Sequence, residues 1–115
     1  MRRMSFMLTE PQLLDGTKDV TRRDGWENAV PGEQLMAIDK SDRVRSTEAV
    51  RELAVIEVVS VRRERLGLIT DKEVVREGFP QWRRGDFLRF MLRTLRLHPQ
   101  RMITRIEFRI VRKLV

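Results

Sequence analysis

Residues 52–63, Glu-Leu-Ala-Val-Ile-Glu-Val-Val-Ser-Val-Arg-Arg, carry the strongest strand signal in this 115-residue chain. The stretch is rich in β-branched residues, and its long apolar run is typical of a strand that is buried on at least one face. We therefore expect a central strand here. A second strand is expected over residues 103–111, where apolar and polar side chains alternate.

Shorter elements are expected around these two strands. Strands are predicted at residues 4–8 and 34–38, with a polar loop at residues 39–48. Helices are predicted at residues 11–15, at residues 72–76, and from residue 82 or 86 to residue 97.

Capping residues set the ends of the first two helices. Thr9 is expected to cap the first helix, and Gly16 is expected to end it in the left-handed conformation. Thr70 begins the next helix and Gly78 closes it, which places Glu77 at a helix C-terminus.

The order of these elements lacks the regular strand and helix alternation of a parallel sheet. We expect one α+β domain spanning residues 1–115, built as a small mixed β-barrel with two or three flanking helices. Such a barrel leaves an open mouth where loops gather and where concave sites form.

The composition excludes several kinds of site. The chain has no cysteine, which excludes disulfides, thiolate nucleophiles and thiolate zinc sites and agrees with a reducing compartment. His98 is the only histidine and has no acidic neighbour in sequence, so we expect no metal, no cofactor, and a helix-capping role for this residue. No apolar run is long enough for a membrane span or a signal peptide, and we expect a cytoplasmic protein.

The chain is strongly basic, with a formal net charge of +7 and 20 arginines against 4 lysines. Arginine binds phosphate through a bidentate fork and stacks on bases, which favours a nucleic-acid or nucleotide partner. Genomic base composition can produce the same excess. Arg89, Arg93 and Arg96 share one face of the expected last helix, and we favour a solvated surface over a phosphate track for them.

Residues 16–23, Gly-Thr-Lys-Asp-Val-Thr-Arg-Arg, bring reactive groups together. Lys18 is a candidate base, Thr21 a candidate nucleophile, and Arg22 and Arg23 candidates for holding phosphate or a polarised carbonyl. The alternative is a solvated basic turn. In a regular strand the side chains of Thr21 and Arg23 point to the same face and that of Lys18 points to the other. Lys18 can therefore meet Thr21 only if the chain bends between them. For the same reason, Arg23 is favoured over Arg22 for lining the pocket that contains Thr21.

Three motifs resemble those of the ASCH domain family, a relative of the PUA-like barrels. They are Gly-x-Lys-x-x-Thr-x-Arg-Asp at residues 16–24, Val-Ser-Val-Arg-Arg-Glu at residues 59–64, and Glu-Gly-Phe-Pro at residues 77–80, before a helix bearing Trp and Phe. The resemblance covers nearly the whole chain. It implies a β-barrel with flanking helices and a cleft for RNA or nucleoside chemistry.

Some ASCH proteins hydrolyse the acetamide of N-acetylated cytidine with a lysine, a threonine three residues later, and a distant glutamate. This chain has Lys18, Thr21 and Glu77 at the matching positions. The resemblance implies an amidohydrolase acting on a linear amide, with Thr21 as nucleophile, Lys18 as base and Glu77 as acid. Those enzymes carry an apolar residue where this chain has Arg22.

Other interpretations stay open. The net charge of +7 and the arginine excess favour a non-catalytic RNA-binding module as one alternative. The family resemblance implies a ribonuclease as another, in which Lys18 and Arg23 stabilise a phosphorane. Glu77 is predicted either to hold a proton near the negative end of its helix or to pair with Arg23 or Arg76. Trp26 is a candidate for stacking a substrate base, and the alternative is that Trp26 and Trp82 plug the barrel.

Overall fold

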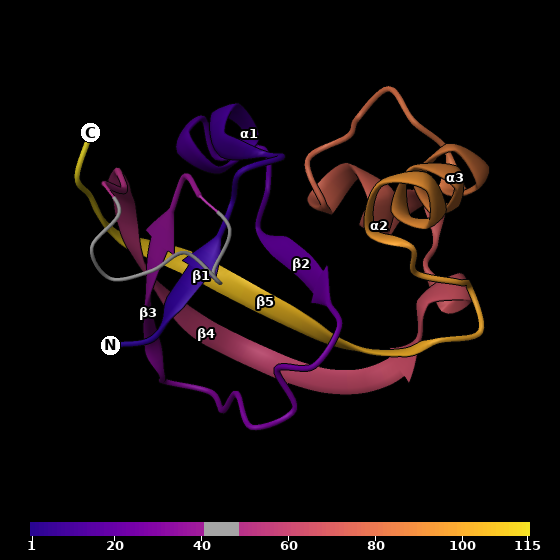
Figure 1. The fold of residues 1–115 in the computed structure, drawn as a ribbon, viewed down its shortest axis with the longest axis horizontal. Helices are drawn as coiled ribbons and strands as arrows, with labels where there is room; N and C mark the ends of the chain where they lie inside the picture. The colour runs from indigo at the N-terminus through magenta and orange to yellow at the C-terminus, as the bar shows by residue number, and fades with distance from the viewer. Residues whose placement is uncertain (41–48) are drawn as a thin grey trace.

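The two long strands expected from the sequence lie at the centre of the sheet in the computed structural model, which describes residues 1–40 and 49–115 (Figure 1). β4 (Glu52–Arg65) and β5 (Met102–Lys113) pair antiparallel along most of their lengths. Residues 53–56 of β4 are all buried, as their unbroken apolar run predicts. A register shift between Val58 and Ser60 leaves Val59 exposed.

Three short strands complete a mixed sheet in the order β1-β3-β4-β5-β2. β1 (Arg3–Ser5) runs parallel to β3 (Gln34–Ile38), and β2 (Val20–Arg23) runs antiparallel to β5. The sequence prediction for β3 is confirmed at both ends. The strand predicted at residues 4–8 ends earlier, at Ser5, and most of the predicted loop at 39–48 lies outside the described residues.

The expected α+β class is confirmed, but the strand pairing in the described part of the chain does not close a barrel. β1 and β2 are the two edges of the sheet, and no backbone ladder joins them there. Both are short, three and four residues long, and a side chain spans the distance instead. Arg23 of β2 donates from Nη2 to the carbonyl oxygen of Ser5 at 2.5 Å.

The described residues form three α-helices and a short 3-10 helix beside the sheet: α1 (Glu10–Leu14), η1 (Leu66–Leu68), α2 (Asp71–Arg76) and α3 (Arg84–Leu95). α1 packs on the sheet over a first core, which includes Phe6, Leu13 and Phe108. α2 and α3 lie together at the far end of β4 and β5, over a second core that includes Val74 and Phe87 (Figure 1). The two cores flank the segment that leads into β2.

The predicted caps are confirmed at Gly16, Thr70 and Gly78 but not at Thr9 and His98. The C-cap residue of α3 is Arg96, and His98 Nδ1 instead accepts a hydrogen bond from the Gln100 backbone. The Thr70 hydroxyl accepts a hydrogen bond from the Glu73 backbone at 3.2 Å, and Gly16 and Gly78 have positive φ. Thr9 stands at the N-cap position of α1, but its side chain makes no capping hydrogen bond. Its backbone φ of −137° and ψ of 30° depart from the usual N-cap conformation, so the prediction of a side-chain cap was wrong there.

Gly78 is expected to be the most sensitive glycine of the fold. Its φ is +104°, and a Cβ added there would lie 2.9 Å from Gln12 Cβ and 3.3 Å from Lys18 Cβ. Gly78→Ala should therefore lower the free energy of unfolding by about 2 kcal/mol or more. Gly32→Ala is the matched control, because Gly32 also has positive φ (+89°) but nothing within 4 Å, and it should cost only about 1 kcal/mol. Equal losses in chemical denaturation of the two variants would contradict this account.

Candidate functional site

The segment before β2 bends, as the candidate site requires. Gly16 has φ +83°, and the Lys18 amide then donates to the carbonyl oxygen of Gln12 at 3.0 Å, so Lys18 lies before the strand begins. The alternation of faces along a strand therefore does not apply to Lys18. Lys18 and Thr21 both line one cavity.

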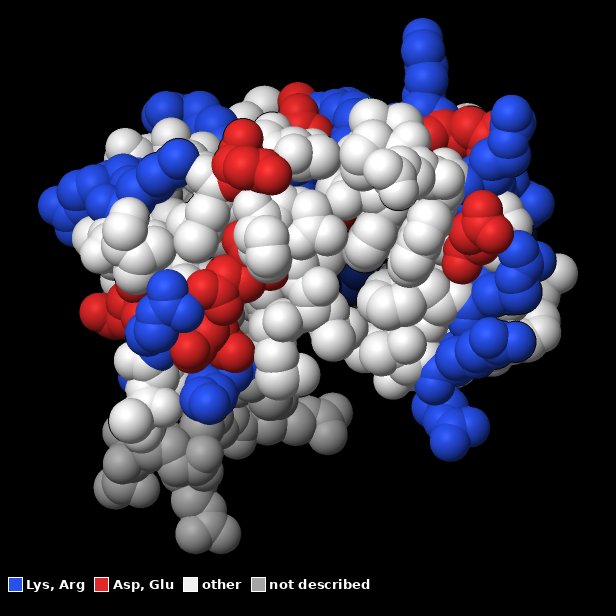
Figure 2. All heavy atoms as spheres, turned by 90° about the horizontal axis from the view of Figure 1, so that it is seen from above, with Lys and Arg blue, Asp and Glu red and all other residues white. Residues whose placement is uncertain are grey.

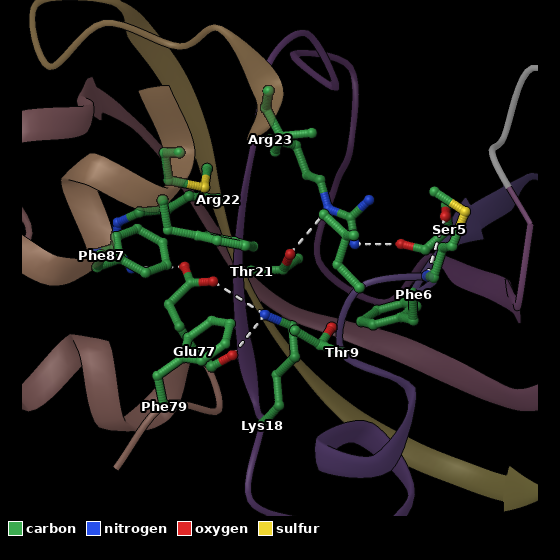
Figure 3. A pocket seen from close by; sticks show the side chains of 15 residues that line it. Ser5, Phe6, Thr9, Lys18, Thr21, Arg22, Arg23, Glu77, Phe79 and Phe87 are labelled. Atoms are coloured by element: carbon green, nitrogen blue, oxygen red, sulfur yellow. Dashed lines mark hydrogen bonds and ion pairs between the residues drawn. The ribbon is translucent and has the colours of Figure 1, made fainter. Parts of the chain in front are cut away.

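This cavity has a volume of about 200 Å³ and lies between the β1–α1 connection, β2 and α3 (Figure 3). Its walls are mostly apolar, with four phenylalanines among them, and its charged groups come from β2, the segment before it, and the end of α2. The lining residues that enter the argument below are Thr9, Lys18, Thr21, Arg22, Arg23 and Glu77.

Lys18 and Glu77 form a buried ion pair at the cavity. The Lys18 ammonium donates to Glu77 Oε1 at 3.0 Å and to the Glu77 backbone carbonyl oxygen at 2.8 Å (Figure 3). Each side chain is only 3% exposed. Glu77 is the C-cap residue of α2, so the end of this helix holds the lysine in place.

Arg22 completes the surroundings of Glu77. Its Nη1 donates to Glu77 Oε2 at 3.0 Å, and its Nη2 donates to Glu73 Oε1 at 2.8 Å. The Arg22 side chain is fully buried, and its Nε has no hydrogen-bond partner among the described residues. Both oxygens of Glu77 thus accept hydrogen bonds from cations.

The surroundings of Lys18 make its proton easier to remove. Burial lowers the pKa of the Lys18 amine below its usual value, and the nearby charges of Arg23 and Arg22 lower it further, against the opposing attraction of Glu77. An amine with a lowered pKa can serve as a general base. The ammonium uses two of its three N–H groups on Glu77, which leaves one for another partner.

Thr21 is held by Arg23. Arg23 Nε donates to Thr21 Oγ1 at 2.9 Å, while Nη2 of the same guanidinium is anchored to Ser5. Because Oγ1 accepts this bond, the Thr21 hydroxyl hydrogen is directed elsewhere. Figure 3 shows the Thr21 hydroxyl and the Lys18 ammonium facing the same space. No hydrogen bond between Lys18 and Thr21 is formed in the described structure.

The structure brings together five of the six residues proposed from the sequence. Lys18, Thr21, Arg22, Arg23 and Glu77 all line the cavity. The preference for Arg23 over Arg22 is not supported, because both line it. Glu77 pairs with Lys18 and Arg22, so the alternative pairing with Arg23 or Arg76 was wrong.

Trp26 does not line the cavity. It packs against the first core, and the Arg2 guanidinium lies 4.7 Å from its ring centroid. Trp82 stacks on Phe79 with ring centroids 4.3 Å apart. The surroundings of both tryptophans therefore agree with the alternative prediction, in which they pack against other side chains instead of stacking on a substrate base.

Sequence reasoning missed the apolar wall and Thr9. Phe79, Phe87 and Phe90 line the cavity, although the spacing of Phe87, Met91 and Leu95 alone predicts only a helix face packed against a core. Thr9 is 7% exposed and also lines the cavity. The sequence pattern around Thr9 predicted only a helix cap. The signal that could have identified Thr9 as a cavity residue is its position directly before a helix that packs beside Lys18.

The most exposed of the described residues that line the cavity are uncharged. Met7, Leu8 and Leu95 are the most exposed of its lining residues, at 54, 44 and 46%. Figure 2 shows uncharged atoms around a hollow with charged atoms deep inside it, and the lysines and arginines mostly at the margins of this face. Arg89, Arg93 and Arg96 are exposed, in agreement with the solvated surface expected for them.

Glu73 is expected to make the protein sensitive to acid. The Arg105 hydrogen bond, with help from Arg22, lowers the pKa of Glu73 from 4.5 to about 2. Its contribution to the free energy of unfolding is therefore complete above about pH 4.5 and is lost as the pH falls through about 2. We expect a loss of roughly 2 kcal/mol, allowing for partial solvent screening. Chemical denaturation across this pH range should show this loss of unfolding free energy in the wild type and much less of it in Glu73→Gln. If the free energy of unfolding falls equally with pH in both proteins, Glu73 is not the group responsible.

No group of three or more metal-binding side chains is found in residues 1–40 and 49–115. In the same residues no helix is long and apolar enough to cross a membrane.

Comparison with known proteins shows that the fold of this chain is similar to the folds of two solved structures. No protein-family model matches the chain, and no curated protein matches its sequence. A crystal structure of an Enterococcus faecalis protein of family DUF984 superposes with a TM-score of 0.63 and 16% identity, covering 92% of this chain and 71% of the other. An ASCH domain from Lactobacillus crispatus superposes with a TM-score of 0.58 and 13% identity, covering 90% and 70%. The chain therefore has an α+β fold similar to that of an ASCH domain.

Proposed function

We propose that the protein is an amidohydrolase that removes the acyl group from N-acetylated cytidine or a closely related modified nucleoside. The observation that carries this proposal is the buried Lys18–Glu77 pair, which shares one cavity with the Thr21 hydroxyl. A hydroxyl nucleophile needs a neighbouring base, and an amine whose pKa is lowered by burial is such a base.

The proposed reaction has two steps. Neutral Lys18 takes the proton of Thr21, and Oγ1 attacks the acyl carbon; when the C–N bond breaks, the Lys18 ammonium returns that proton to the leaving exocyclic amine. The acetyl ester on Thr21 is then hydrolysed by water, which Lys18 deprotonates, releasing acetate and restoring the hydroxyl. Arg23 is suited to stabilise the negative charge that develops on Oγ1 as Thr21 loses its proton, because its Nε donates to that oxygen at 2.9 Å.

Glu77 receives a different role from the acid expected at first. Both of its oxygens already accept hydrogen bonds, one from Lys18 and one from Arg22. We assign it to holding Lys18 beside Thr21 and to stabilising the ammonium that forms when Thr21 loses its proton. Lys18 carries the proton in both directions.

The shape of the cavity favours a small ligand over an RNA strand. Its volume of about 200 Å³ lies below the range of about 300–1,000 Å³ for drug-sized ligands. Among the described residues, its most exposed lining side chains are Met7, Leu8 and Leu95 rather than arginines, whereas RNA binding depends on cations that follow the phosphates. The aromatic wall suits a flat nucleobase.

Incubation of the purified protein with N-acetylcytidine tests the proposal. We expect release of cytidine and acetate, with saturation in substrate concentration. An absence of turnover would reject the activity. RNA binding whose logarithm falls steeply with the logarithm of salt concentration, together with no turnover, would favour the RNA-binding alternative.

A further inference from the structure

The buried Arg22 is costly for the fold. A guanidinium removed from water with an unsatisfied Nε–H is unfavourable, and an apolar side chain of similar size is often as stable or more stable in such a place. Arg22 is fully buried and its two terminal nitrogens bind Glu77 and Glu73. Such a group is better explained by what it does to its partners than by stabilisation of the fold.

We propose that Arg22 is a positioning residue that occupies one oxygen of the Glu77 carboxylate, so that only the other carboxylate oxygen binds Lys18, and Lys18 stays able to give up its proton. The proposal rests on the proposed function, in which Lys18 acts as the base. The two contacts are of equal length, 3.0 Å from Arg22 Nη1 to Oε2 and 3.0 Å from Lys18 Nζ to Oε1. The charge of one carboxylate is thus divided between two cations.

The other charged groups around Lys18 support this role. Glu77 faces it from the end of α2, and Arg22 and Arg23 face it from β2, while the residues before α1 and those of α3 that line the cavity are uncharged. Glu73 is linked to this group through Arg22, whose Nη2 it binds at 2.8 Å. Without Arg22, the full charge of Glu77 would act on the Lys18 ammonium and hold its proton more tightly.

Titration of Lys18 by NMR tests this directly and does not depend on turnover. The chain has only four lysines, at positions 18, 40, 72 and 113, so the Lys18 side-chain signals are readily assigned. Arg22→Met should raise the pKa of Lys18 by at least about one unit. The rising limb of the pH profile of kcat/KM should move upward by the same amount, with about a tenfold loss near pH 7 that is recovered at higher pH.

Two further variants keep the test decisive. Arg22→Lys restores a cation beside Glu77 and should titrate close to the wild type, and Arg22→Gln removes the charge while keeping a hydrogen-bond donor, in case the methionine variant does not fold. Arg105→Met is the matched control, because Arg105 binds Glu73 at 2.7 Å from the same buried cluster without touching Glu77. Arg105→Met should leave the rising limb of the pH profile of kcat/KM where it is in the wild type.

The outcomes separate the inference from the proposed function. A Lys18 titration that is unmoved or lowered in both Arg22→Met and Arg22→Gln overturns the inference, whatever the activity. If the Arg22 variants lose kcat/KM at every pH without a shift in the rising limb of the pH profile, Arg22 has only a structural role, and the inference is also overturned. A shifted titration with no hydrolysis by the wild type would leave the inference standing and reject the amidohydrolase.

Discussion

Glu77→Gln is expected to lower the free energy of unfolding by about 3–5 kcal/mol, as measured by chemical denaturation near pH 7. The carboxylate neutralises Lys18 and Arg22, whose side chains are 3% and 0% exposed. Glutamine has nearly the same shape but leaves two buried cations without an anion on that side, and this desolvation is what costs stability. Glu57→Gln is the control: Glu57 binds Arg109 at 3.0 Å at the surface, and its loss should cost less than about 1 kcal/mol.

A second comparison isolates the pairing. Lys18→Met leaves Arg22 to neutralise Glu77, so the double variant with Glu77→Gln should cost less than the sum of the two single variants. Additive losses, or a loss below about 1 kcal/mol for Glu77→Gln alone, would show that the pair does not carry the stability that its burial implies.

Lys18→Met is expected to lower kcat/KM for N-acetylcytidine by at least about 100-fold, the usual contribution of a general base. The reason is that Thr21 then has no group to take its proton, while Arg23 still holds its oxygen. Initial rates measure the effect. Lys72→Met removes an exposed lysine from α2 and should leave the rate unchanged. Retention of more than about a tenth of the activity by Lys18→Met would exclude Lys18 as the base.

The sheet was predictable where the sequence pattern is long. β4 and β5 follow from extended β-branched and alternating runs, and β3 was predicted at both ends. The edge strands were less predictable, because their ends depend on where the chain turns away from the sheet. Barrel closure was expected, yet β1 and β2 are short, and Arg23 rather than a backbone ladder links them.

The candidate site was predictable in its membership but not in its pairing. The resemblance to ASCH proteins indicated Lys18, Thr21 and Glu77, and the bend after Gly16 follows from glycine chemistry. The role of Arg22 was not predictable, since its partner Glu77 lies 55 positions away at the end of a helix. The hydrogen bond from the Asp19 amide to the Arg76 carbonyl oxygen, at 3.0 Å, joins the end of α2 to the segment before β2 and so brings the two side chains close together.

Trp26 was predicted as a cavity residue but does not line the cavity. Its place shortly after the motif suggested a stacking platform, but the chain turns at Gly25 and Trp26, both with positive φ, and the ring packs against the first core. Proximity in sequence to Thr21 therefore did not bring the ring into the cavity. The aromatic wall comes instead from Phe79, Phe87 and Phe90, which lie after α2 and on α3.

The central claim is that Thr21 accepts the acyl group in this cavity, and mass spectrometry of a rapidly quenched reaction with N-acetylcytidine tests it most directly. The account predicts an acetyl group on the peptide that contains residue 21 in the wild type, and neither this adduct nor turnover in Thr21→Val. Full turnover by Thr21→Val, or an acetyl group that accumulates only on another residue, would contradict the account.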